Sequence, residues 1–177
     1  MRLFEKFNGL LLNPVTFKVR PEKSLRVVLR GGVGNQLFQY FAGLDYATKH
    51  GSGVKLDATH VARGMTNREF LLPNVLKAFF DVPSYEIHIP KYGGLGAKWN
   101  SIITLNSPVS RLFRPNQHTS QVIGFDEALL NKNNLTSLVG YHQTYLHVDN
   151  LLRNHKITFL ETKARTPWVL DLSLIHI

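Results

Sequence analysis

Three glycines within four residues, followed at once by two carboxamides, form the stretch of this sequence best suited to binding a ligand. Gly31, Gly32 and Gly34 precede Asn35 and Gln36. A glycine turn that leads into a helix can bind an anion, because free N–H groups point out of the helix N-terminus and no Cβ keeps the ligand away. We therefore expect the backbone at Gly32 and Gly34, with the Asn35 and Gln36 amides, to bind substrate.

A second polar group follows a later apolar run. Tyr141, His142 and Gln143 end the stretch Ser137–Gln143, which has the composition of a buried strand. Ligands of open α/β sheets gather at the carboxyl ends of the strands. We expect Tyr141 and Gln143 to bind substrate, and His142 to act as a catalytic base or hydrogen-bond partner. An ordinary polar strand end is the equal alternative.

Asp57 and Arg30 complete the set of residues with useful chemistry. Asp57 follows the short apolar run Val54–Leu56, so a strand would place it at a carboxyl end too. We consider it as a catalytic base or a group that orients a hydroxyl, with an N-cap of the next helix as the favoured alternative. Arg30 brings positive charge to the glycine turn, or is simply ion-paired or solvated.

The elements that must position these residues begin with a βαβ unit. Leu25–Leu29 reads as a buried strand, Asn35–His50 as a helix that stops at Gly51, and Val54–Leu56 as a second strand. Such a unit is parallel and right-handed, which predicts an α/β fold with a Rossmann-like parallel sheet. Further strands are predicted at Tyr85–Pro90 and Ser137–Gln143, and further helices at Asp126–Asn131 and Val148–Lys156.

Length and composition indicate one globular domain. The chain has 177 residues, of which 44% are hydrophobic. We expect an N-terminal extension at 1–23 and a single domain at 24–177. There is no cysteine and no pair of histidines at helical spacing with a third ligand nearby, so we expect neither a disulfide nor a metal site. The net charge of +9 favours an anionic partner.

Two known phosphate loops fit the glycine turn poorly. A Walker A loop needs a Lys followed by Ser or Thr, which the turn lacks, and the third glycine place of a dinucleotide-binding loop is Leu37. A dinucleotide-dependent reductase is therefore disfavoured. A purely structural turn, with Asn35 as the helix N-cap, stays open as an alternative.

The stretch "GGVGNQLFQYFAG" resembles the N-terminal signature of the family 11 glycosyltransferases, the α-1,2-fucosyltransferases. "VKLDATH", "REFLLPNV" and "LVGYHQTYLHV" resemble further segments of that family in the same order. The resemblance covers about Arg26 to Val148.

The resemblance implies an inverting, metal-independent enzyme that transfers L-fucose from GDP-fucose to the 2-hydroxyl of a galactoside. The implied fold is a two-lobed GT-B-like arrangement, and the implied partners are a GDP-sugar donor and an oligosaccharide or glycolipid acceptor, with no cofactor. No apolar run reaches the roughly 20 residues that span a bilayer, so we expect a cytoplasmic protein. Its positive charge would allow peripheral contact with the inner membrane.

One family signature, H-x-R-R-x-D, is not present in full. The chain has no Arg-Arg pair and ends in "LSLIHI", where His176 matches the first position of that signature or the likeness is due to chance. The family's arginines bind the diphosphate, a task that suits the guanidinium fork. We therefore expect 24–177 to be the N-terminal lobe without the donor-binding lobe, and to be weakly active or inactive alone.

A non-catalytic basic module that binds anions or nucleic acid is the alternative function. Its aromatic residues would be expected to alternate with Lys and Arg on a surface. Here the aromatics lie in apolar helical patterns instead, so we expect no nucleic-acid partner. Arg111 and Arg114 are the residues whose charge reversal would test this alternative.

Overall fold

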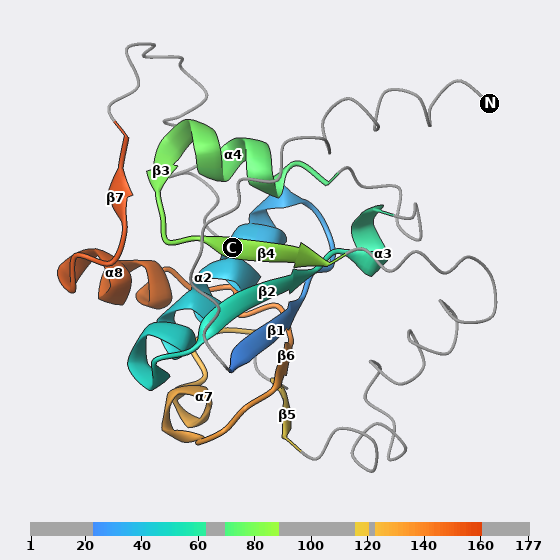
Figure 1. Ribbon diagram of the computed structural model, residues 1–177, viewed down its shortest axis with the longest axis vertical. Helices are drawn as coiled ribbons and strands as arrows, with labels where there is room; N and C mark the ends of the chain where they lie inside the picture. The colour runs from blue at the N-terminus through green and yellow to red at the C-terminus, as the bar shows by residue number, and fades with distance from the viewer. Residues whose placement is uncertain (1–22, 63–69, 89–115, 121–122, 161–177) are drawn as a thin grey trace.

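The computed structural model describes residues 23–62, 70–88, 116–120 and 123–160 (Figure 1). Most of the predicted N-terminal extension, the basic loop with Arg111 and Arg114, and the C-terminal end with His176 lie outside these ranges. The elements in chain order are β1 (Ser24–Val28), α2 (Val33–His50), β2 (Gly53–Asp57), α3 (Thr59–Ala62), α4 (Leu72–Phe79), β3 (Phe80–Asp81), β4 (Tyr85–His88), β5 (Gln117–Thr119), α7 (Glu127–Asn131), β6 (Ser137–Val139), α8 (Leu146–Arg153) and β7 (Thr158–Phe159).

A five-stranded sheet forms the centre of the described fold. Its order is β4-β2-β1-β6-β5, and all four strand pairings are parallel. A separate two-stranded sheet pairs β3 with β7 in the antiparallel direction. The predicted α/β fold with a parallel sheet is confirmed, and so is the β1–α2–β2 unit with which it begins.

Helix α2 lies behind the sheet in Figure 1 and packs closely on β1. The approach depends on Gly43 in the middle of the helix. A Cβ at this position would lie only 2.3 Å from Cγ2 of Val27, closer than real side chains approach. The absence of a side chain at Gly43 therefore sets the distance between helix and sheet. Helices α4, α7 and α8 also contact α2.

The two faces of the sheet differ in polarity. Leu25 and Val27 of β1 point to the side that holds the buried core, at 0% and 1% exposure. Arg26 lies on the other side, in register with Lys55, which is in register with Glu86. Lys55 Nζ and Glu86 Oε1 are 3.1 Å apart. Because both faces of a parallel sheet are usually apolar, these charged rows are an unusual feature.

Several predicted boundaries shift by a few residues. Helix α2 begins at Val33, with Gly32 as its N-cap, so the alternative in which Asn35 caps the helix is wrong. The predicted stop at Gly51 is confirmed, since this residue is the C-cap with a left-handed backbone. Strand β6 ends at Val139, well before Gln143.

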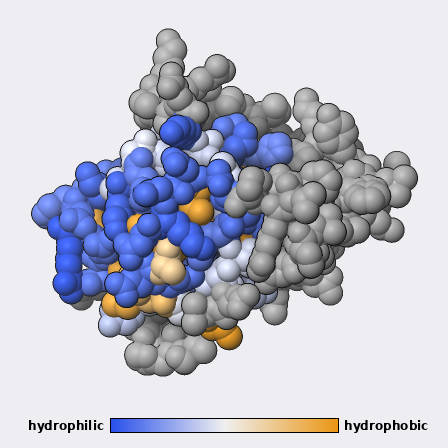
Figure 2. Space-filling model, turned by 90° about the horizontal axis from the view of Figure 1, so that it is seen from below, coloured by the Kyte–Doolittle hydropathy of each residue, from blue (hydrophilic) through white to orange (hydrophobic). Residues whose placement is uncertain are grey.

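The surface seen from below in Figure 2 is mainly hydrophilic over the described residues, with scattered hydrophobic residues among them. Among the described residues, no helix combines the length and apolar character needed to cross a membrane.

Candidate functional site

The carboxyl ends of β1 and β6 lie side by side at the point where the strand order reverses. From β1 the chain continues through α2 to β2 on one side, while β6 pairs with β1 on the other side. In open α/β sheets the ligand crevice forms at such a point. The glycine turn follows β1, and the segment Gly140–Tyr145 follows β6. Both predicted groups of polar residues thus reach the same edge of the sheet.

In the glycine turn, the first glycine has a backbone conformation that favours glycine, and the next two glycines have open space where a side chain would lie. Gly31 has a φ of 75°, and a Cβ there would lie 2.6 Å from Asn35 Nδ2. Gly32 has an extended backbone, and Gly34 lies in the first turn of α2. Of the described residues, none has an atom within 4 Å of a Cβ added to Gly32 or Gly34. A ligand therefore has room to approach the start of α2.

Two buried glutamines hold this turn in place. Gln36 Nε2 donates to Gly31 O at 3.0 Å, and Arg30 N donates to Gln39 Oε1 at 2.8 Å. Gln36 is 0% exposed, so its side chain points into the protein and not toward the opening expected for a substrate-binding residue. Sequence analysis missed Gln39. A second glutamine one turn along the same helix was the available signal.

Asn35 and Gln143 join the two halves of the site. Gln143 Nε2 donates to Asn35 Oδ1 at 2.6 Å, across 108 residues of sequence. Both side chains are half-buried. Within the described part of the chain, Asn35 Nδ2 and Gln143 Oε1 make no further hydrogen bond, which leaves one donor and one acceptor at the rim of the site for a ligand hydroxyl.

His142 precedes Gln143 in the chain and is fully buried. It has a left-handed backbone with a φ of 49°, and neither ring nitrogen has a hydrogen-bond partner among the described residues. A Cβ on Gly140 would lie 2.9 Å from His142 Nε2, so only glycine fits there. Burial, followed by the charges of His147 and His118, lowers the pKa of His142 to about 4. The imidazole is therefore neutral at pH 7 and able to accept a proton, but it is closed off from solvent.

Two Asp–His pairs flank His142, and sequence analysis predicted neither. His147 Nδ1 lies 2.8 Å from Asp45 Oδ2, and its ring stands edge-on to that of His142 with centroids 6.2 Å apart. His118 Nε2 lies 2.6 Å from Asp126 Oδ2. Both pairs are buried, and they fix the surroundings of His142. Asp45 on the buried side of a helical pattern was the one sequence signal, since a buried carboxylate needs a partner.

Asp57 is 1% exposed and both its oxygens are engaged. Oδ2 accepts two hydrogen bonds from the Arg26 guanidinium, and Oδ1 accepts the Thr59 N–H at 3.0 Å and the Thr59 hydroxyl. Burial by itself raises the pKa of Asp57, but the Thr59 hydrogen bonds and the Arg26 charge outweigh burial, so the pKa is lowered. The Thr59 N–H bond at the start of α3 agrees with the capping alternative. A catalytic base needs a free oxygen, which Asp57 lacks here.

Arg30 places a cation between the two halves of the site. Its side chain is half-buried, and it lies within electrostatic range of Tyr141 and Asp57. Burial lowers the pKa of Arg30, while both neighbours act in the opposite direction. A guanidinium ion stays charged in proteins, so this position favours an anionic group in the crevice.

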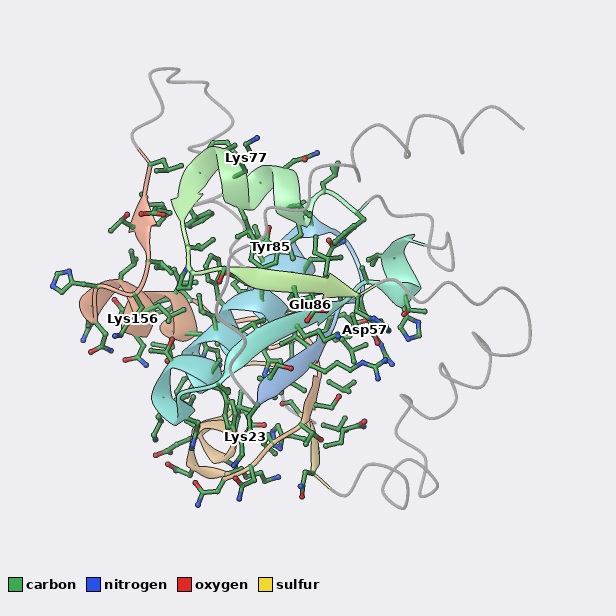
Figure 3. All side chains as sticks on the ribbon, in the orientation of Figure 1. Lys23, Asp57, Lys77, Tyr85, Glu86 and Lys156 are labelled. Carbon is green, nitrogen blue, oxygen red and sulfur yellow. The ribbon has the colours of Figure 1, made fainter. Side chains whose placement is uncertain are left out.

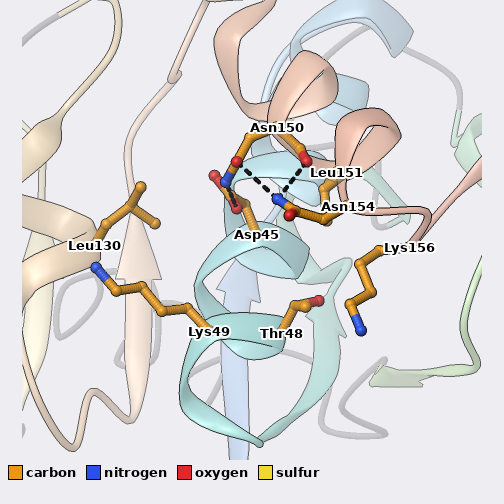
Figure 4. A pocket seen from close by; sticks show the side chains of 8 residues that line it. All are labelled: Asp45, Thr48, Lys49, Leu130, Asn150, Leu151, Asn154 and Lys156. Atoms are coloured by element: carbon orange, nitrogen blue, oxygen red, sulfur yellow. Dashed lines mark hydrogen bonds between the residues drawn. The ribbon is translucent and has the colours of Figure 1, made fainter.

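A hollow of about 550 Å³ lies elsewhere, at the C-terminal end of α2 (Figure 4). In Figure 3, Lys156 of this hollow and Asp57 of the carboxyl edge appear at opposite ends of the molecule. Its polar groups bond one another, since Asn150 Nδ2 donates to Asp45 and Asn154 Nδ2 donates to Asn150. It is lined by Asp45, Thr48, Lys49, Leu130, Asn150, Leu151, Asn154 and Lys156.

The fold and this edge together define an α/β protein whose candidate site residues gather where the strand order of a parallel sheet reverses. Comparisons with protein-family models, with curated proteins and with solved structures found no match to this chain. Within the described ranges, no group of three or more His, Asp or Glu side chains could hold a metal ion.

Proposed function

We propose that this chain is the N-terminal lobe of a GT-B-like glycosyltransferase that transfers L-fucose from GDP-fucose to the 2-hydroxyl of a galactoside. The observation that supports it best is the hydrogen bond between Asn35 and Gln143. These residues belong to two separate stretches that resemble the fucosyltransferase family, and they meet at the edge of the sheet where ligands bind.

The first turn of α2 and Arg30 are proposed to face the diphosphate of the donor. The first N–H groups of a helix have no partner within the helix, and the helix dipole is positive at this end. Arg30 adds a full charge nearby. As the bond between fucose C1 and the phosphate oxygen breaks, negative charge grows on the diphosphate, and fixed donors aimed at it lower the barrier. No metal ion is required for this role.

His142 is proposed as the base in preference to Asp57. Its nitrogens are unbonded within the described residues, whereas both Asp57 oxygens are engaged. His142 would take the proton from the acceptor 2-hydroxyl, the hydroxyl oxygen would form a bond to fucose C1, and GDP would leave with the electron pair of the broken bond. Because His142 is buried, the backbone after β6 must turn to bring the ring to the acceptor.

Binding of GDP to the whole chain, measured by isothermal titration calorimetry, tests this proposal. The first turn of α2 and Arg30 are proposed to supply only part of the diphosphate site, so we expect this binding to be weak. The chain has no Arg-Arg pair, so we expect transfer itself to be weak or undetectable, and binding is the more informative measurement. Arg30→Gln should weaken GDP binding by about tenfold or more, as loss of one hydrogen bond to a charged group predicts.

Lys156→Ala, in the separate hollow, is the matched control and should leave GDP binding unchanged. Binding of NAD(H) without binding of GDP would contradict the proposal and favour a reductase. Salt-dependent retention on DNA, without GDP binding, would favour the nucleic-acid module.

A further inference from the structure

The short segment after β6 sorts its side chains into two sets. His142 and His147 point inward and are 0% exposed, while Tyr141 and Tyr145 point outward with 43% and 72% exposure. Two hydrogen bonds order the segment locally, because Thr144 N donates to His142 O at 2.7 Å and Leu146 N donates to Thr144 Oγ1 at 3.2 Å. The outward tyrosines are thus carried on a backbone with hydrogen bonds of its own.

The exposure of the two tyrosines is significant because of where they lie. Single exposed apolar residues are common and need no explanation. Here, however, Tyr141 and Tyr145 each lie two residues from Gln143 in the chain, and the Gln143 amide bonds Asn35 at the carboxyl edge of the sheet. Tyr141 also lies within electrostatic range of Arg30. Neither tyrosine packs against another aromatic ring among the described residues.

Tyrosine rings beside a carboxamide match the surface of a sugar. One face of a pyranose carries mainly C–H groups, which pack against an aromatic ring, while its rim of hydroxyls needs donors and acceptors. Tyrosine supplies a large rigid contact area with a polar tip at a low entropy cost. Gln143 Oε1 and Asn35 Nδ2, which have no hydrogen-bond partner among the described residues, supply an acceptor and a donor near the tyrosines in the chain.

We propose that Tyr141 and Tyr145, with the Gln143 amide between them, form the binding subsite for the galactoside acceptor. This inference rests on the proposed function for the identity of the sugar. The rings hold the C–H face of the galactose, and the Asn35–Gln143 pair binds its hydroxyls. A nucleobase would also stack on tyrosine, and loss of GDP binding in the tyrosine variants distinguishes that alternative below.

Titration of the whole chain with lactose, followed by saturation-transfer NMR, tests the subsite. Tyr141→Ala and Tyr145→Ala should each weaken lactose binding about five- to tenfold, as loss of one aromatic contact predicts. Tyr145→Phe keeps the ring and should stay within about twofold of the unmodified protein. Phe159→Ala removes another exposed ring, 60% exposed in β7, and should not change lactose binding.

Each outcome decides for or against the subsite. Lactose binding that survives both alanine substitutions, or no lactose binding in a chain that binds GDP, overturns it while leaving the donor half of the proposed function intact. Loss of GDP binding in Tyr141→Ala or Tyr145→Ala overturns it in favour of base stacking. Lactose binding that depends on the tyrosines in a chain that does not bind GDP supports the subsite and refutes the transferase. Circular dichroism spectra verify that each variant is folded.

Discussion

The two ends of helix α2 make an instructive comparison. At the N-terminal end, Gly31 has a left-handed backbone, Arg30 adds a cation, and the Asn35–Gln143 pair has one donor and one acceptor without a partner among the described residues. At the C-terminal end, Gly51 caps the helix and its N–H bonds Ala47 O. The hollow of about 550 Å³ lies at this second end.

The comparison shows that the hollow and the polar groups that are available to bind a ligand lie at different ends of α2. The hollow beside the C-terminal end has volume, but its amides and Asp45 already bond one another. The helix dipole there is negative, which disfavours an anion despite Lys49 and Lys156. At the N-terminal end, Asn35 Nδ2 and Gln143 Oε1 have no hydrogen-bond partner among the described residues. Polar groups without a hydrogen-bond partner are therefore a better guide to the candidate site than the volume of a hollow.

The largest effect is expected from a substitution that disturbs the packing of α2 on β1, on which both ends of the helix depend. In Gly43→Ala, the new Cβ would collide with Val27, so we expect the free energy of unfolding to fall by about 3 kcal/mol. Urea denaturation measures this. Adding Val27→Ala should make room, so the double variant should lose less than the sum of the two single losses. A Gly43→Ala variant as stable as the unmodified protein would show that the helix does not sit this close to β1.

The next largest effect is a pH dependence of stability, which we expect from His142 at the N-terminal end of α2. The pKa of His142 is lowered to about 4, so between its ordinary value of 6.5 and pH 4 only the unfolded chain takes up the proton. This lowers the stability of the folded state as the pH falls, by about 2 kcal/mol between pH 7 and pH 5. Thermal melts across this range should show the loss, and His142→Gln should remove most of it.

His60 is the comparison for this measurement. Burial, followed by the charge of Arg30, also lowers the pKa of His60, but this side chain is half-buried and His142 is fully buried. His60→Gln should therefore remove a smaller part of the pH dependence. An equal effect of the two substitutions would mean that His142 is not the main titrating group.

Alanine substitutions at Gly31 and Gly51, the glycines with positive φ at the two ends of α2, distinguish the cost of backbone strain from an effect on GDP binding. Gly31→Ala and Gly51→Ala should each cost about 1 to 2 kcal/mol in stability, because both positions have positive φ. Only Gly31→Ala should also weaken GDP binding, by about tenfold, since its Cβ would displace Asn35. Equal loss of GDP binding in the two variants, by calorimetry, would remove the distinction between the ends.

The smallest effect is expected at the C-terminal hollow. Lys49 Nζ makes only a 3.4 Å contact with Asn131 Oδ1 on the surface. Lys49→Ala should change stability by less than about 0.5 kcal/mol and leave GDP binding as it was. A clear drop in GDP affinity in this variant would move the site to the opposite end of α2.

The sequence predicts the strands and helices better than it predicts the positions of the candidate site residues. The apolar run from Leu25 and the stop at Gly51 are local signals, and both appear in the structure within a residue. Asn35 reads locally as a helix cap, yet its partner is Gln143, on a distant segment. His142 reads as an open strand tip. It is buried because β6 ends at Val139 and the backbone then turns left-handed.

The remaining misses have the same cause. Gln36 is a polar residue in a first turn, where side chains commonly face solvent, but the carbonyl of Gly31 draws it inward. Asp45 and His147 are both charged or polar in sequence and become a buried pair only when α8 packs on α2. Tertiary contacts decided these positions, and no single-sequence pattern encodes them.

The pairing of β7 with β3 restricts how this edge can move. The chain from β6 to β7 is anchored in the main sheet at one end and in the small sheet at the other, through the pairs Phe80–Phe159 and Asp81–Thr158. With both ends held, we expect His142 to become exposed by rotation of the few peptide units near Gly140, and not by displacement of the whole segment. Under the proposed function, the acceptor sugar would then reach the ring from the rim of the site.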